Sequence, residues 1–422
     1  MNTIKFYTFG CKANQYDTQQ IRESFLGMGL REAGRKEDAD VYLINTCTVT
    51  GKADSESLNC IRRAERENPK AKIVVTGCLA ELDSRAINKQ GRINLIVKNS
   101  QKEKIAQLFS RINGLKRIKD CRGITDFSGH TRAFLKIQDG CDNCCSYCKV
   151  PLARGHSVSK HLTEILRETH SLVDNGFKEI VLTGICLGAY GRDFRNKGTL
   201  VEVIEALEKI KGLSRIRLSS IEASDISDEL LSKISESAKL CPHLHIPIQS
   251  GDDGILEKMG RRYTGKDYLR LAGKARKKIP KLAITTDILV GFPGEDEAAF
   301  GNTLRLLKNI LPLKVHIFPY SPREKTRAAK FRGLPDPAAV NERIERARGT
   351  AQDCSLKYRN SFLKKDMQVL IEGKIKTGSS LWEGYSENYI KARVSSKINL
   401  ANQMVCVKCR EIFPDFVRAD FN

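Results

Sequence analysis

Short apolar runs alternate with helical stretches along most of this chain, and this alternation limits its fold more than any other feature. The first runs are IKFYTFG, DVYLINT and KIVVTG, and helical stretches begin near Asn14 and Ala53. Such strand-helix repeats are typical of parallel α/β sheets. At 422 residues the chain is too long for one ordinary core. We therefore expect several domains, the first of them a parallel α/β domain over residues 1–115.

Three cysteines of this first series occupy equivalent positions. Cys11, Cys47 and Cys78 each follow the apolar run of one strand, in YTFGC, LINTC and VVTGC. Because the carboxyl ends of parallel strands meet at one edge of a sheet, where ligands bind, the three thiols should converge there. The alternative is three separate core cysteines.

A second strand-helix series follows a polar stretch, residues 116–129, that is typical of a linker. Its strand candidates are RAFLKIQ, KEIVLTG, SRIRLSSI, HLHIPIQS, LAITTDILVG and KVHIFPYS. These units predict a partial or complete parallel barrel over residues 127–360, with functional groups on the carboxyl side of the strands. Within it, residues 337–363 are expected to form a charged helix. In the last segment, 363–422, the short runs MQVLIEG, NYIKARV and QMVCVKCREIF predict a small β-barrel or OB-like module.

The strongest chemical motif lies directly after the first strand of the second series. The segment DGCDNCCSYC places Cys141, Cys145 and Cys148 in a C-x3-C-x2-C spacing. A closed structural zinc site needs four protein ligands, whereas three close thiolates suit a four-iron cluster with one iron left open. The adjacent Cys144 does not easily join them, because neighbouring side chains diverge. A zinc site or a redox dithiol is the alternative.

The remaining cysteines carry weaker signals. No apolar stretch is long enough to span a membrane, so we expect a cytoplasmic protein whose thiols stay reduced. Five others lie in apolar or helical segments and are expected as small buried side chains: Cys60, Cys121, Cys144, Cys241 and Cys354. Cys406 and Cys409 form a lone C-x-x-C, which we expect to be exposed or strand-paired thiols rather than a third metal site.

Positive charge is concentrated in two segments. The chain holds 72 Lys and Arg against 50 Asp and Glu, a net charge of +22. Residues 258–281 hold ten basic side chains and one acidic, and residues 322–365 hold twelve and five. Such patches favour a polyanionic partner. A generally basic, solvated surface is the alternative.

With both cysteine triplets in place, the chain resembles the radical S-adenosylmethionine superfamily, and within it the methylthiotransferases, over essentially its full length. The resemblance implies one [4Fe-4S] cluster on Cys141, Cys145 and Cys148 and an auxiliary one on Cys11, Cys47 and Cys78. It implies a flavodoxin-like α/β domain, a partial (βα)6 barrel and, from GYSENYIKARV, an RNA-binding TRAM domain of the OB-like type. The implied reaction turns a C–H bond into C–SCH3 with two S-adenosylmethionine molecules per turnover.

The same resemblance implies contacts to S-adenosylmethionine. Tyr147 would lie beside the adenine, and Gly184, in the segment LTGI, would receive the methionine amino group. Glu222 and Gln249 would contact the ribose or the carboxylate. The turn GFPGE, residues 291–295, also matches the family.

The residues around the first two cysteines indicate the substrate. FYTFGCKANQYDTQQ and LINTCTVTGKADSES are most similar to the bacterial enzymes that modify N6-threonylcarbamoyladenosine beside the tRNA anticodon. The implied partners are the anticodon stem-loop and an electron donor such as flavodoxin or ferredoxin, with a monomer as the default. Three residues depart from the family pattern: Cys186 stands where His or another polar residue is more frequent, Lys149 replaces an apolar residue, and Lys160 stands where Arg is usual.

Three alternatives remain at this point. The same chemistry acts on isopentenyladenosine in tRNA in some relatives, and on an aspartate of a ribosomal protein in others. A non-enzymatic, zinc-stabilised RNA-binding protein is more remote.

Overall fold

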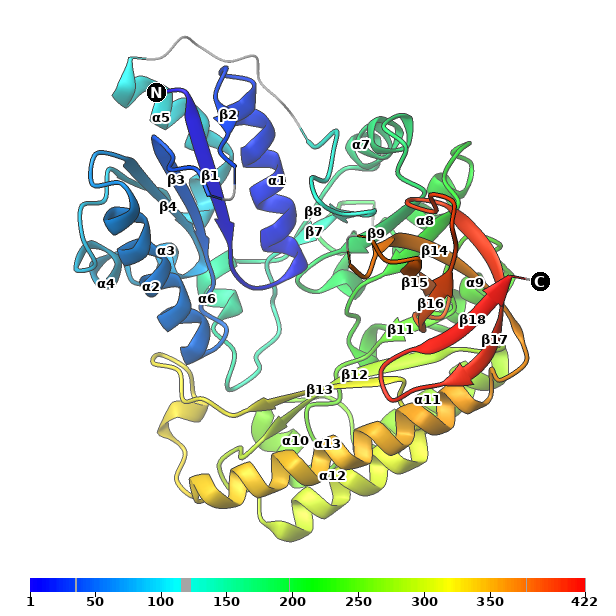
Figure 1. Ribbon diagram of the computed structural model, residues 1–422. Helices are drawn as coiled ribbons and strands as arrows, with labels where there is room; N and C mark the ends of the chain where they lie inside the picture. Colours follow the sequence, from blue (N-terminus) through cyan, green and yellow to red (C-terminus); the bar gives the residue numbers. More distant parts are fainter. Residues whose placement is uncertain (35, 115–122, 197, 377, 422) are drawn as a thin grey trace.

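The computed structural model describes residues 1–34, 36–114, 123–196, 198–376 and 378–421, arranged as three regions (Figure 1). Cys121 and part of the expected linker lie outside these ranges. In the described ranges, no helix is long and apolar enough to cross a membrane. The domain limits 1–115, 127–360 and 363–422 stay predictions.

The N-terminal region is a parallel sheet of five strands in the order β2-β1-β3-β4-β5, as expected of a flavodoxin-like domain. Its strands are β1 (Thr3–Thr8), β2 (Arg31–Glu32), β3 (Val41–Thr46), β4 (Lys72–Gly77) and β5 (Leu95–Ile96). Its helices are α1 (Lys12–Leu26), α2 (Gly51–Glu67), α3 (Cys78–Leu82), α4 (Ser84–Asn88), η1 (Asn99–Lys104) and α5 (Ile105–Asn113).

Helices cover both faces of this sheet. On one face Leu43 of β3 packs with Phe25 of α1, and on the other its neighbours Tyr42 and Ile44 pack with Ile61 of α2. Burial on both sides explains why these strands read as continuous apolar runs rather than alternating ones.

The central region contains six parallel strands in two three-stranded sheets, β10-β9-β6 and β11-β12-β13. Single bridges, Ile216 to Leu240 and Ser220 to His245, connect the two sheets. The strands are β6 (Arg132–Lys136), β9 (Glu179–Thr183), β10 (Arg215–Leu218), β11 (His243–His245), β12 (Ala283–Val290) and β13 (Lys314–Pro319). All six fall on the expected runs, so the partial (βα)6 barrel is confirmed.

Helices surround this barrel. They are α7 (Leu162–Asp174), α8 (Leu200–Glu208), α9 (Asp228–Glu236), α10 (Asp253–Met259), α11 (Gly265–Lys278) and α12 (Glu297–Ile310). Short elements fill the loops: β7 (Gln138–Asp139), α6 (Val150–Arg154), β8 (Val158–Ser159), η2 (Leu187–Ala189), η3 (Ala223–Asp225) and η4 (Ala328–Lys330). The expected charged helix is α13 (Pro337–Asn360), which runs beside α12 (Figure 1).

The C-terminal region is a closed barrel in the order β14-β15-β16-β18-β17. Its strands are β14 (Asp366–Lys374), β15 (Leu381–Ser386), β16 (Lys391–Ser395), β17 (Met404–Ile412) and β18 (Val417–Phe421). The sequence did not predict β15 and β18. Each is short and only alternate residues are buried, such as Trp382 and Ala419, so neither has an apolar run.

Buried arginines attach this barrel to the central region. Arg217 of β10 forms an ion pair with Glu179 at 2.7 Å and donates to the carbonyls of Ser386 and Glu387. Its neighbour Arg215 donates to the carbonyl of Tyr385 at 3.0 Å. The C-terminal barrel is therefore held at the base of β9 and β10 by charge-assisted hydrogen bonds.

Candidate functional site

The sheet brings the first three cysteines to one edge. Cys11 is the N-cap of α1, Cys47 directly follows β3, and Cys78 begins α3 after β4. Thr8 pairs with Asn45, and Thr46 with Gly77, so the three strands end at the same level.

Close backbone approach shapes this edge. Gly10 and Gly77 have φ values of 91° and 103°, which favour glycine. A Cβ on Gly10 would lie 2.6 Å from the Cys47 sulfur, and one on Gly77 would lie 2.3 Å from the carbonyl oxygen of Thr46. Burial raises the pKa of Cys47 to about 12, and the charges of Cys78 and Cys11 add to this effect. Binding of a metal there would displace the protons of these thiols.

Cys141, Cys145 and Cys148 lie in the loop between β7 and α6, which we call the cradle loop. The Cys141 amide donates to the carbonyl of Gly155 at 3.1 Å, and the Ser146 amide donates to that of Met259 at 2.9 Å. Gly140 has a φ of 71°, and a Cβ there would lie 1.8 Å from the His156 carbonyl oxygen. The loop is thus held by backbone contacts at its start and near its middle.

Cys186 lies beside this loop. A hydrogen bond from its thiol lowers the pKa of Cys141 to about 7, whereas burial raises that of Cys148 to about 12. The Cys186 sulfur also lies 3.6 Å from Asp225 Oδ2, and Asn143 Nδ2 donates to it at 3.7 Å. The departure at residue 186 therefore places a thiol next to the cradle loop.

Arg261 connects two residues expected to contact S-adenosylmethionine. It donates to the Tyr147 hydroxyl at 2.5 Å and forms an ion pair with Glu222. The Tyr147 ring packs edge-on against Phe292 of the GFPGE turn, with centroids 6.3 Å apart. The sequence presented Arg261 only as part of a basic segment, because nothing in its spacing indicates a buried partner.

The other two expected contacts also lie at strand ends. Gly184 follows β9, and a Cβ there would lie 2.8 Å from Gln138 Oε1. Gln249 lies beyond β11 in a left-handed conformation, with φ of 63°. Strained backbone of this kind concentrates at binding sites. The roles of Tyr147, Gly184, Glu222 and Gln249 stay predictions.

The donor chemistry of both sites fits an iron–sulfur cluster. Each offers three thiols, and a four-iron cluster held by three cysteines keeps one iron free. In the part of the chain that the structure describes, no three His, Cys, Asp or Glu side chains are grouped closely enough to hold a single metal ion. A cluster spreads its sulfur ligands around a larger body than one ion does.

The remaining cysteines follow the expectations with one exception. Cys60, Cys241 and Cys354 are buried, and on β17 Cys406 is exposed while Cys409 is buried. Residues three apart on a strand point to opposite faces, so these two thiols do not form a metal knuckle. The prediction for Cys144 is wrong: its side chain is exposed, because the cradle loop turns it outward.

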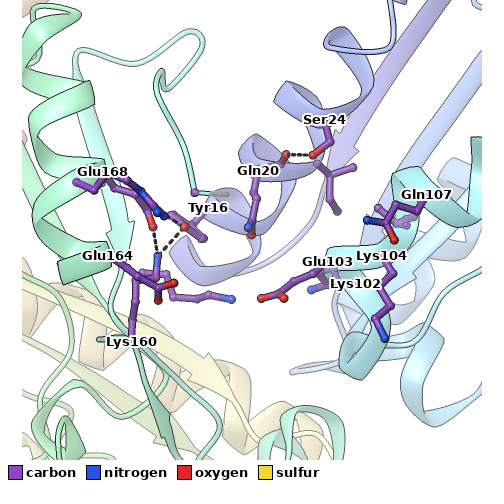
Figure 2. Close-up of a pocket in the computed structure, with 15 residues that line it drawn as sticks. Tyr16, Gln20, Ser24, Lys102, Glu103, Lys104, Gln107, Lys160, Glu164 and Glu168 are labelled. Atoms are coloured by element: carbon purple, nitrogen blue, oxygen red, sulfur yellow. Dashed lines mark hydrogen bonds and ion pairs between the residues drawn. The ribbon is translucent and has the colours of Figure 1, made fainter. Parts of the chain in front are cut away.

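Lys160 occupies an interdomain contact. Its ammonium donates to the Tyr16 hydroxyl at 2.7 Å and to Glu168 Oε1 at 2.6 Å (Figure 2). These groups line a cavity of about 450 Å³ between α1, η1 and α7, and no cysteine lines it. The departure from the family's Arg thus lies at a contact between α1 and α7 rather than on a cysteine loop.

Two family descriptions match the sequence. "Uncharacterized protein family UPF0004" matches residues 3–98, and "Radical SAM superfamily" matches residues 135–307. The first covers Cys11, Cys47 and Cys78, and the second covers Cys141, Cys145 and Cys148.

Named relatives cover nearly the whole chain. It is 37% identical to the threonylcarbamoyladenosine tRNA methylthiotransferase MtaB of Bacillus subtilis, over 97% of this chain and 94% of that protein. It is 34% identical to the tRNA-2-methylthio-N(6)-dimethylallyladenosine synthase of Moorella thermoacetica, over 89% and 88%.

Among solved structures, the fold is similar to the radical S-adenosylmethionine methyltransferase TsrM of Kitasatospora setae, which holds cobalamin and a [4Fe-4S] cluster. The TM-score is 0.55 at 14% identity, over 76% of this chain and 75% of that one. This likeness concerns the fold alone. The identity and coverage shared with the named relatives show that the chain belongs to the radical S-adenosylmethionine methylthiotransferases.

Proposed function

We propose that this protein is a tRNA methylthiotransferase that converts N6-threonylcarbamoyladenosine beside the anticodon to its 2-methylthio derivative. The observation that carries the proposal is the presence of two sites with three cysteines each. One lies at the edge of the N-terminal α/β sheet, and the other lies in the loop between β7 and α6 of the central barrel. A radical enzyme that only opens a C–H bond needs the second site alone.

The cofactors would be S-adenosylmethionine and two [4Fe-4S] clusters, which together supply a carbon radical, a sulfur atom and a methyl group. Cys141, Cys145 and Cys148 would hold one cluster, and Cys11, Cys47 and Cys78 the other. Tyr147, Gly184, Glu222 and Gln249 would position S-adenosylmethionine. A side-chain base is not sufficient, because hydrogen on an adenine ring is too weakly acidic.

A basic groove supports an RNA substrate. It has a volume of about 630 Å³ and lies between β13, α13 and the C-terminal barrel. Its lining includes five cations and two tyrosines: Lys314, Arg348, Arg359, Lys391, Arg393, Tyr385 and Tyr389. The tyrosine rings stack with centroids 5.0 Å apart. Cations that contact phosphates, next to aromatic rings that stack on bases, are typical of RNA-binding surfaces.

Lys12 favours the threonylcarbamoyl substrate over the isopentenyl one. Its ammonium lies 5.8 Å from the centroid of the Phe134 ring, and it has no hydrogen bond or ion pair among the residues that the structure describes. A threonylcarbamoyl group carries a carboxylate, whereas an isopentenyl group is apolar. An unpaired cation between the two domains is suited to the charged group.

The proposal also assigns a separate role to each of the three predicted domains. Residues 1–115 would carry the auxiliary cluster, 127–360 the radical chemistry and 363–422 part of the RNA contact. The protein would act as a monomer in the cytoplasm, and a flavodoxin or ferredoxin would supply its electrons.

Mass spectrometry of products tests the substrate. The anaerobically reconstituted protein would be offered anticodon stem-loops with threonylcarbamoyladenosine, isopentenyladenosine or plain adenosine. We expect a methylthio product from the first only. A product from the isopentenyl substrate would favour the second family of relatives, and no RNA product with modification of a ribosomal-protein aspartate would overturn the proposal.

A further inference from the structure

An ionic cluster with a buried centre lies between the N-terminal and central regions. Its members are Asp17 on α1, Lys102 on η1, Lys136 on β6, Asp139 on β7 and Arg154 at the end of α6. The side chains of Arg154 and Asp17 are each 2% exposed. We call these five residues the interdomain ionic cluster.

Arg154 is at its centre. One guanidinium nitrogen donates to both carboxylate oxygens of Asp139, at 2.7 and 2.9 Å. The other donates to Asp17 Oδ2 at 3.1 Å and to Asn14 Oδ1 at 2.5 Å. Lysines surround the two carboxylates: Lys102 lies 2.8 Å from Asp17, and Lys136 lies 2.7 Å from Asp139 and also pairs with Asp17.

Three members of the cluster lie on segments that carry cysteines. Asn14 and Asp17 lie in the first turns of α1, whose N-cap is Cys11. Asp139 is two residues before Cys141, and Arg154 ends the helix that follows Cys148. The cluster therefore joins the backbone that carries Cys11 to both ends of the cradle loop.

A third attachment reaches Cys78. Asn99, at the start of η1, donates through one amide nitrogen to the Cys78 sulfur at 3.7 Å and to the Ala153 carbonyl at 2.8 Å. Ala153 directly precedes Arg154, and Lys102 follows on the same η1 segment. Both cysteine sites are thus connected through one network of hydrogen bonds and ion pairs.

The contact between the two regions uses charged residues where apolar ones could also have served. Burying charged groups costs several kcal/mol each unless their geometry is good, and an apolar contact of the same size is often as stable. A forked guanidinium between two carboxylates fixes distance and direction, which an apolar contact does not. The charged residues are therefore explained by the precise placement of the two regions that they provide, rather than by a gain in stability.

We propose that the interdomain ionic cluster fixes the spacing and orientation of the two cysteine sites, with Arg154 as its central positioning residue. This inference rests on the proposed function, because only a two-site reaction requires such precision. Sulfur carried at one site must reach the carbon opened beside the other, and a misplacement of about 1 Å lowers a rate by as much as about a hundredfold.

Arg154→Met tests the inference, with Glu168→Gln as the matched control. The control weakens the contact among Lys160, Tyr16 and Glu168, which also joins the two regions but includes none of the five residues of the interdomain ionic cluster (Figure 2). Three quantities would be measured: iron per chain, the magnetic interaction between the two reduced clusters by electron paramagnetic resonance, and the ratio of 5′-deoxyadenosine to methylthio product.

For Arg154→Met we expect iron to remain at about eight atoms per chain. The magnetic interaction should change, and the deoxyadenosine-to-product ratio should rise by up to about a hundredfold. Arg154→Lys should lie between this variant and the wild type, because one ammonium replaces a fork. Glu168→Gln should match the wild type in all three measurements.

An unchanged magnetic interaction and ratio in Arg154→Met would overturn the inference. If that variant does not retain iron, Asp17→Asn replaces it, with the same expectations and the same overturning result. The magnetic measurement needs no substrate, so it judges the positioning role even if the wild-type protein fails to modify tRNA. That second failure would count against the proposed function alone.

Discussion

The two cysteine sites each offer three thiols but are built in opposite ways. Cys11, Cys47 and Cys78 are far apart in sequence, and the parallel sheet brings them together. Cys141, Cys145 and Cys148 lie within eight residues of one loop. The first site therefore depends on the folding of a whole domain, and the second on local backbone geometry. Substitutions in the two sites should therefore have different effects on iron content and stability.

Removing one predicted ligand from each site should separate their chemistry most strongly. We expect Cys47→Ala and Cys148→Ala each to retain about four irons of about eight. Cys47→Ala should still form 5′-deoxyadenosine but no methylthio product, whereas Cys148→Ala should form neither. Iron analysis and chromatography of the products decide this. Deoxyadenosine formation by Cys148→Ala would contradict the assignment.

A pair of glycine substitutions should show the difference in construction. Gly77→Ala places a Cβ against the β3 backbone inside the sheet, so we expect the free energy of unfolding to fall by about 3 kcal/mol. Gly140→Ala disturbs only the cradle loop and should remove one cluster with a smaller change in stability. Denaturant unfolding and iron analysis measure both effects.

Gly114→Ala is the control for these variants. Its φ is 63°, but a Cβ there would meet no atom within 4 Å. It should cost about 1 kcal/mol and retain all the iron. Equal behaviour of the three variants would mean that backbone strain alone, and not the crowding at each cysteine site, determines the result.

The two sites also differ in how much the sequence could predict. The cradle spacing was visible directly, and the strand-end cysteines followed from the pattern of parallel strands. The residues that join the sites were not visible. Asp17, Lys102 and Arg154 lie in segments without a distinguishing motif, and their burial depends on how two domains meet. Arg261 was hidden for the same reason.

Lys12 should discriminate between substrates. We expect Lys12→Met to weaken binding of the threonylcarbamoyl stem-loop by about tenfold, which is the order of one charge-assisted hydrogen bond, and to leave plain adenosine unaffected. Fluorescence anisotropy measures both affinities. Lys52→Met, at a side chain that is 84% exposed on α2, is the control. An equal loss for both stem-loops would show only a general electrostatic effect.

Acid should weaken the central barrel. His243 is buried with Nε2 3.0 Å from Thr285 Oγ1, and burial, helped by Arg217 and His245, lowers its pKa well below 6.5. The unfolded chain therefore binds more protons, and stability falls as the pH drops below about 6.5. From pH 6.5 to 5.5 we expect the apo-protein to lose up to about 1.4 kcal/mol through this residue. His243→Gln should reduce the loss, and an identical slope would contradict this.

Cys406→Ser should have the smallest effect. This thiol is exposed on β17 and lies on the opposite face from Cys409. Iron content and deoxyadenosine formation should equal those of the wild type. Loss of metal in this variant would reveal a third site.

The central claim is that the two sites act together on one tRNA nucleoside. Its most direct test is mass spectrometry of tRNA nucleosides from cells that lack the gene, complemented with the wild-type gene or with Cys47→Ala. We predict that the 2-methylthio derivative of threonylcarbamoyladenosine is absent without the gene, returns with the wild type and does not return with Cys47→Ala. Persistence of that nucleoside in the cells that lack the gene, or its return with Cys47→Ala, would contradict the claim.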